Sequence, residues 1–174
     1  MSKSIAISSA HGRHVRGARS FIDEVDESRR VCNKVAEYLR KAGVTVRGPF
    51  NDDTSRSVSA NLNAIVGWHN KQSRSLDVSI HFNAFQKTSA GRGVECLYVS
   101  NGNQQLAKHV AAGIAYNSPL HDRGEKKRTN LRFLNSTSKP AVLVEVCFVD
   151  SLFDSNSYKA SFDKICKAIA DALK

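Results

Sequence analysis

Apolar and polar positions along the chain alternate in blocks that predict strands and helices in turn. A short apolar run at Ile5–Ser8 predicts a first strand. Apolar residues spaced by three and four over Asp23–Ala42 predict a long helix, which ends at Gly43. A short strand at Val44–Val46 and a helix beginning near Val58 follow. The first third of the chain therefore reads strand, helix, strand, helix.

The rest of the chain continues this alternation. The expected elements are strands at Leu76–Phe82, Gly93–Val99, Leu131–Leu134 and Ala141–Val146, helices at Gln104–Tyr116 and Tyr158–Leu173, and a charged loop at Asn117–Asn130. Helices that alternate with continuous apolar strands are typical of a parallel sheet covered on both faces. The sequence therefore predicts an α/β fold, with a mixed, mostly parallel twisted sheet of about six strands and helices on both faces.

Length and composition limit the possible classes of protein. The chain has 174 residues, 41% of them hydrophobic, which fits one domain over residues 1–174 with no separate binding domain. The longest apolar stretch, Pro140–Val149, is too short to cross a bilayer, so no membrane insertion is expected. Met1–Ala10 has too short an apolar core for a signal peptide and reads as the start of the first strand. We therefore expect synthesis in the cytoplasm without a signal peptide.

The four cysteines are scattered without a C-x-x-C pair, which favours buried free thiols in a reducing compartment. The formal net charge of +10 indicates attraction to polyanions, and by charge alone nucleic acid, anionic cell-wall polymers and membrane surfaces all stay open. The chain has no aromatic-rich basic motif, which disfavours nucleic acid. Lys126–Arg128 is the densest basic cluster and the expected site of contact with a polyanion.

Among the ionisable side chains that end or interrupt expected strands, we single out three. His11 follows the first strand, His81 lies near the end of the strand Leu76–Phe82, and Glu145 lies inside the strand Ala141–Val146. Each of them is costly to bury without a partner. Because functional groups gather at the carboxyl ends of strands in open α/β sheets, these three are candidate site residues.

The first helix contributes a further carboxylate. At about 100° per residue, Glu24 falls within about 10° of the centre of the apolar stripe, and Glu27 falls about 60° to one side. We therefore expect Glu24 to point toward the sheet and Glu27 to reach solvent. If the helix begins in another register, Glu27 replaces Glu24 as the candidate ligand.

Two imidazoles and one inward-facing carboxylate form a set of three ligands, His11, Glu24 and His81, that can hold one zinc ion and leave a position open for water. Glu145 is then placed to move protons as a general acid and base. A histidine at a strand end is also a common structural residue, and the spacings match no local motif such as H-E-x-x-H. On the residues alone, the zinc site and the structural explanation both stay open.

Several segments resemble zinc-dependent N-acetylmuramoyl-L-alanine amidases of the amidase-3 class, which are found in bacterial autolysins and phage endolysins. The similar segments are Ser8–Gly12 (SSAHG, where the family has G-H-G), Ser79–Ala84 (SIHFNA), Gly93–Glu95 (GVE), Arg123–Lys126 (RGEK) and Lys139–Phe148 (KPAVLVEVCF). The resemblance covers nearly the whole chain and keeps the family's order. Ala10, Cys147 and Val46–Gly48 depart from the family pattern, but none of them replaces a ligand.

The resemblance implies that His11, Glu24 and His81 hold one Zn²⁺ ion and that Glu145 is the catalytic acid and base. The implied reaction is hydrolysis of the amide between N-acetylmuramic acid and L-alanine in bacterial peptidoglycan. Asn83 and Glu95 are candidates for orienting groups. The first alternative is a zinc peptidase that cuts the peptidoglycan stem peptide, and the second is a non-catalytic basic module that binds wall polymer or nucleic acid.

The resemblance, the net charge and the lack of a long apolar stretch together give the expected partners and location. The partners are peptidoglycan and anionic cell-wall polymers, without nucleic acid and without membrane insertion, and the chain is expected to be a monomer. It would reach the cell wall after release during phage lysis or mother-cell lysis.

Overall fold

A computed structural model describes residues 3–174, so Met1 and Ser2 at the start of the predicted first-strand segment lie outside the described residues. The strands are β1 (Ser4–Gly12), β2 (Thr45–Asp52), β3 (Leu76–Asn83), β4 (Val94–Tyr98), β5 (Asp122–Lys127) and β6 (Ala141–Phe148). The helices are α1 (Glu24–Lys41), α2 (Val58–Lys71), α3 (Gln104–Tyr116), α4 (Arg132–Ser136), α5 (Leu152–Ala160) and α6 (Phe162–Leu173), with one 3₁₀ turn at Asn101–Asn103.

The six strands form one sheet in the order β2-β1-β3-β6-β4-β5. All neighbouring pairs are parallel except β4 and β6, which are antiparallel. The carboxyl ends of β1, β3 and β6 therefore lie at the same end of the sheet as the amino ends of β4 and β5. We call this end of the strands the shared sheet edge. This edge is where the candidate site residues His11, His81 and Glu145 were expected to gather.

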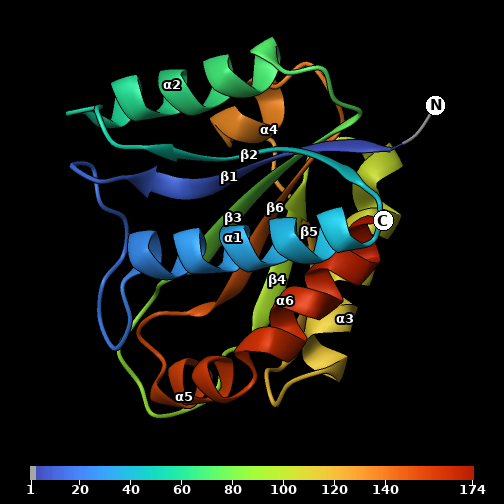
Figure 1. The fold of residues 1–174 in the computed structure, drawn as a ribbon. Coiled ribbons are helices and arrows are strands. Elements are labelled where there is room, and N and C mark those ends of the chain that lie inside the picture. Colours follow the sequence, from blue (N-terminus) through green and yellow to red (C-terminus); the bar gives the residue numbers. More distant parts are fainter. Residues whose placement is uncertain (1–2) are drawn as a thin grey trace.

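Helices cover both faces of the sheet (Figure 1). Helices α2 and α4 lie over one face, and α1, α3 and α6 pack together over the other. The larger core lies under α1, α3 and α6, where Val35, Ile80 and Ile169 are fully buried. The predicted fold class, a mixed and mostly parallel sheet with helices on both faces, is confirmed. None of the helices in residues 3–174 combines the length and the apolar character that a membrane crossing requires.

Two of the predicted elements were wrong. The charged segment Asn117–Asn130, expected to be a loop, contains β5, an edge strand that pairs only with β4. The apolar pattern could not predict β5, because an edge strand tolerates charged residues and this one shows no alternation of apolar residues. The expected strand Leu131–Leu134 is instead the N-cap and first residues of the short helix α4, which buries Phe133 and Leu134. Apolar runs of this length do not distinguish a strand from a helical turn.

Two element boundaries also differ from the prediction. The single helix expected over Tyr158–Leu173 is two helices, α5 and α6, which meet at Ser161. Strand β2 continues to Asp52, past the predicted Val44–Val46. All four cysteines are buried free thiols, as predicted.

Candidate metal centre and active site

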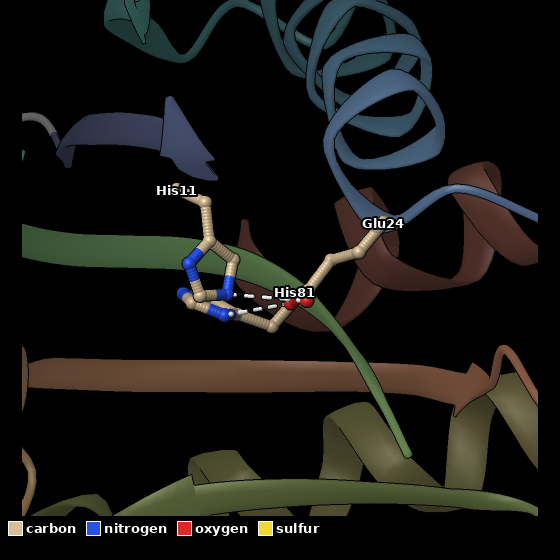
Figure 2. Close-up of side chains that lie close together, drawn as sticks. All are labelled: His11, Glu24 and His81. Carbon is tan, nitrogen blue, oxygen red and sulfur yellow. Dashed lines mark hydrogen bonds and ion pairs between the residues drawn. The ribbon is translucent and has the colours of Figure 1, made fainter. Parts of the chain in front are cut away.

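The side chains of His11, Glu24 and His81 converge at the shared sheet edge (Figure 2). His11 Nε2 lies 3.1 Å from Glu24 Oε2, and His81 Nδ1 lies 3.1 Å from Glu24 Oε1. The two imidazole rings are 5.4 Å apart at their centroids. The carboxylate therefore stands between two histidines that are 70 residues apart in the sequence.

Each of the three groups is placed by the end of a regular element. His11 is at the end of β1, where its backbone takes a left-handed conformation with φ of 53°. His81 is at the end of the adjacent β3. Glu24 is the first residue of α1, whose N-cap Asp23 accepts hydrogen bonds from two backbone amides of the first turn. Two strand ends and one helix start thus meet at one point.

Glu24 is held as a buried anion. Its side chain is only 4% exposed. Besides the two histidines, the backbone N–H of Ala18 donates to Oε2 at 2.9 Å and that of Phe82 donates to Oε1 at 3.2 Å. Burial opposes ionisation, but the hydrogen bonds from His11 and His81 outweigh it and hold the pKa of Glu24 well below its ordinary value. The side chain is therefore charged at neutral pH.

Gly17 closes the other side of this cluster. A Cβ atom at position 17 would collide with the carboxylate of Glu24 and with the ring of His11. Only glycine leaves room for both side chains as they stand. No chemical signal in the sequence marks this position, because glycine carries no functional group.

The three groups have the chemistry and the spacing that a zinc ion needs. Two imidazole nitrogens and a carboxylate oxygen are all zinc ligands, and the three ligand atoms lie within 4.8 Å of one another. Zinc bonds of about 2.0–2.2 Å put tetrahedral ligand atoms about 3.3 Å apart. The two histidine–carboxylate distances, 3.1 Å each, are close to this value. His11, Glu24 and His81 therefore bring zinc-ligating atoms together at a spacing near the one that a zinc ion needs.

Glu145 lies beside this cluster on β6, directly opposite His81 on β3. Paired residues on neighbouring strands point to the same face, so both side chains face α2 and α4. Its Oε2 atom is buried and has no hydrogen-bond partner within residues 3–174. Burial, followed by the negative charges of Glu24 and Glu95, raises the pKa of Glu145 to about 8.

A cavity of about 320 Å³ opens over these residues between the sheet and the helices α2 and α4. Its floor includes His11, His81 and Glu145, and the rest of its lining is mostly apolar, with Ile65 and Phe133 among the lining side chains. A substrate can therefore reach both the histidines and the unpartnered carboxyl group from the same opening.

The remaining acidic candidates have other surroundings. Glu95 on β4 pairs in register with Glu145, and it accepts hydrogen bonds from Asn83 Nδ2 at 3.0 Å and Arg123 Nε at 2.9 Å. Glu27, the fallback ligand, accepts a hydrogen bond from the Tyr158 hydroxyl at 2.7 Å and pairs with Arg30, and it is not part of the His11–Glu24–His81 cluster.

Comparison with known proteins identifies the family of this chain. The family model described as N-acetylmuramoyl-L-alanine amidase (amidase-3) matches residues 5–174. An uncharacterized protein of Clostridium perfringens is 32% identical over 97% of this chain and 51% of its own length. The probable cell wall amidase LytH of Staphylococcus aureus is 28% identical over 99% of this chain and 57% of its own length. The chain thus spans about half the length of the curated relatives it matches.

Among solved structures, the catalytic domain of the CD27L endolysin targeting Clostridia Difficile superposes with a TM-score of 0.88. It is 23% identical, and the match covers 98% of this chain and 96% of that one. At this identity the likeness establishes the fold. Because the family model matches nearly the full length, the chain belongs to the amidase-3 family of N-acetylmuramoyl-L-alanine amidases.

Proposed function

We propose that this chain is a zinc-dependent amidase that hydrolyses the bond between N-acetylmuramic acid and L-alanine in bacterial peptidoglycan. The observation that carries the proposal is the cluster of His11, Glu24 and His81 with the unpartnered carboxyl group of Glu145 beside it in one cavity. Membership of the amidase family and the likeness to a probable cell wall amidase support the same substrate.

In this proposal His11, Glu24 and His81 hold one zinc ion. The chemistry that such a site supplies when zinc is bound is a lower pKa for water and a polarised scissile carbonyl group. The lowered pKa of Glu24 keeps this ligand ionised, and the backbone donors Ala18 and Phe82 fix its position.

Glu145 moves the proton. Its carboxylate accepts a proton from the attacking water at Oε2 and then delivers it to the nitrogen of the departing L-alanine, so that the amine leaves as a neutral group. Burial and the neighbouring carboxylates raise the pKa of Glu145, and this favours the protonated form that delivers the proton to the leaving amine. The apolar lining of the cavity limits competing water around the carboxyl group.

The test combines metal analysis with product analysis. Purified protein is expected to contain one zinc ion, to lose wall clearing on chelation and to recover it when zinc is returned. Mass spectrometry of digested wall should then show new L-alanine amino termini and intact glycan. Cuts found only inside the stem peptide would replace the amidase with a zinc peptidase, and metal-independent binding without turnover would leave a non-catalytic module.

Two matched variants separate the metal ligand from its neighbour on the same helix. Glu24→Gln is expected to lose both zinc and activity. Glu27→Gln, which removes the same charge one turn away, is expected to keep both, because Glu27 contacts Tyr158 and Arg30 and not the histidines. Equal zinc content in the two variants would remove Glu24 from the ligand set.

A further inference from the structure

A second cavity lies on the same face of the sheet, beside Glu145. This basic hollow has a volume of about 440 Å³. It is lined by Asn83, Ala84, Phe85, Arg92, Glu95, Arg123, Lys126, Arg128 and Phe148. Four positive charges therefore stand against a single carboxylate, which makes the hollow a strongly cationic part of the surface next to the proposed active site.

The register of the strands places the hollow relative to the reacting bond. His81, Glu145 and Glu95 lie side by side across β3, β6 and β4, and Arg123 on β5 reaches Glu95 from the next strand. Neighbouring strands are about 4.8 Å apart, so β4 and β5 lie about 5 and 10 Å from the strand of Glu145. An extended peptide covers about 3.3–3.6 Å per residue. The hollow is thus within reach of the second residue beyond the scissile amide.

Most of the positive charge in the hollow is free to take a ligand. Arg123 Nε already donates the 2.9 Å hydrogen bond to Glu95. Among residues 3–174, the side chains of Lys126 and Arg128 have no hydrogen-bond or ion-pair partner, and Arg92 has no carboxylate partner. Both Lys126 and Arg128 therefore keep their full capacity to bind an anion.

Aromatic rings hold two of the guanidinium groups in place. The Arg92 guanidinium lies 4.9 Å from the ring centroid of Phe85 and 5.6 Å from that of Phe148, and Arg123 lies 5.0 Å from Phe148 on β6. Stacking of this kind orients a planar guanidinium and reduces the entropy lost when it binds a carboxylate. The Nε atom of Arg92 is also buried without a partner in the described part of the chain. The hollow is thus partly built before any ligand arrives.

We propose that the basic hollow is the subsite for a free carboxylate on the second residue of the peptide released by the reaction, with Lys126 and Arg128 as its main ligands. The substrate class is therefore an acidic peptide joined to the muramoyl group through L-alanine. This inference rests on the proposed function, since it takes the peptide to extend from the metal site toward β4 and β5. The cavity over α2 and α4 then faces the muramoyl side.

The hollow also gives the cluster Lys126–Arg128 a more specific role than general attraction to wall polymer. Lys127, between the two ligands, instead donates a hydrogen bond to Asn101 Oδ1 at 2.8 Å and does not line the hollow. Alternation along β5 thus turns Lys126 toward the proposed subsite and Lys127 away from it.

The test measures binding of two peptides that differ in one charge. The probes are L-alanyl-D-glutamate γ-methylamide, which has a free α-carboxylate, and its α-amide, and calorimetry with the zinc-loaded protein gives both dissociation constants. The acid is expected to bind about tenfold more tightly than the amide. In the double variant Lys126→Met/Arg128→Met the two constants should agree within about twofold.

Lys71→Met serves as a control for the loss of positive charge away from the hollow. It removes one positive charge from the exposed carboxyl end of α2. This end of the helix precedes the start of β3 and so lies at the opposite end of the strands from the proposed active site. This variant should keep the preference for the acid. Added salt should weaken binding of the acid peptide and leave binding of the amide peptide nearly unchanged.

Equal constants for the two peptides, or a preference that survives in the double variant, would overturn the proposal. Tighter binding of inorganic phosphate than of the acid peptide would also overturn it, because the hollow would then belong to a phosphate-bearing polymer. Neither peptide contains a scissile muramoyl amide, so the result does not depend on turnover. Failure of the proposed function would instead appear as wall digests without new L-alanine amino termini.

Discussion

Replacing Glu145 by Gln should stabilise the metal-free protein at alkaline pH while it removes hydrolysis. The reason is the cost of ionising this buried carboxyl group. Its pKa is raised from the ordinary 4.5 to about 8, first by burial and then by the charges of Glu24 and Glu95. At about 1.4 kcal/mol for each pH unit, this difference corresponds to about 5 kcal/mol. That is a large share of the stability of a domain of this size.

The sign follows from which state holds the proton. Below pH 4.5 the carboxyl group is protonated in both states, so the Glu145 variant and the wild type respond to pH alike. Between pH 4.5 and about 8 the unfolded chain releases the proton and the folded protein keeps it, so the free energy of unfolding of the wild type falls as the pH rises. Above pH 8 the carboxyl group is ionised in both states, so the free energy of unfolding of the wild type falls no further through this group.

Urea denaturation in the presence of a chelator measures this effect. The stability difference between Glu145→Gln and wild type should grow by about 3–5 kcal/mol from pH 4.5 to pH 9. Glu37→Gln is the control, since hydrogen bonds from Lys41 and Lys34 lower the pKa of Glu37 and keep it ionised over most of this range. A Glu145→Gln difference that stays constant with pH would refute the argument that Glu145 is buried at this cost.

Two further substitutions test the surroundings of the site and the core. Gly17→Ala should weaken zinc binding by about 10–100-fold in a chelator competition, because its Cβ collides with the Glu24 carboxylate, whereas Gly67→Ala meets no neighbour and should bind zinc as the wild type does. Asp77→Ala should lower the unfolding free energy by about 3–5 kcal/mol, because it leaves His69 and Arg74 buried without their shared partner. This loss corresponds to a melting temperature lower by about 6–20 °C, and a shift of under about 3 °C would contradict it.

The parts of the fold that the sequence predicted are those whose burial is periodic. Strand β3 is buried along most of its length and carries an apolar residue at every second position from Leu76 to Phe82, and α1 shows one apolar stripe. The stripe was sharp enough to point Glu24 toward the sheet, and Glu24 is buried there. Strand β5 has no such pattern, because it lies at the edge of the sheet and most of its side chains are charged. Its place is set by backbone pairing with β4, which leaves no trace in side-chain hydrophobicity.

The site was partly predictable for a similar reason. His11, His81 and Glu145 are conspicuous because ionisable groups rarely occur in buried strands. Gly17 and Arg92 could not be found in this way. Gly17 matters only through the space it leaves for His11 and Glu24, and Arg92 matters through its contacts with the rings of Phe85 and the sequence-distant Phe148. Both depend on the tertiary arrangement.

A buried network in the core shows why accessibility must be weighed with geometry. Ser8 Oγ lies 2.9 Å from His69 Nε2, and His69 Nδ1 lies 2.7 Å from Asp77 Oδ1, in the order of the triad of serine hydrolases. However, all three residues are 0% exposed, and Asp77 is also bound by Arg74. No substrate carbonyl can approach the Ser8 hydroxyl, so these residues tie α2 to β1 and β3 and do no hydrolysis. His11, whose side chain is 35% exposed, differs because its ring opens into a cavity, and this is why the cluster of His11, Glu24 and His81 is the group that can carry chemistry.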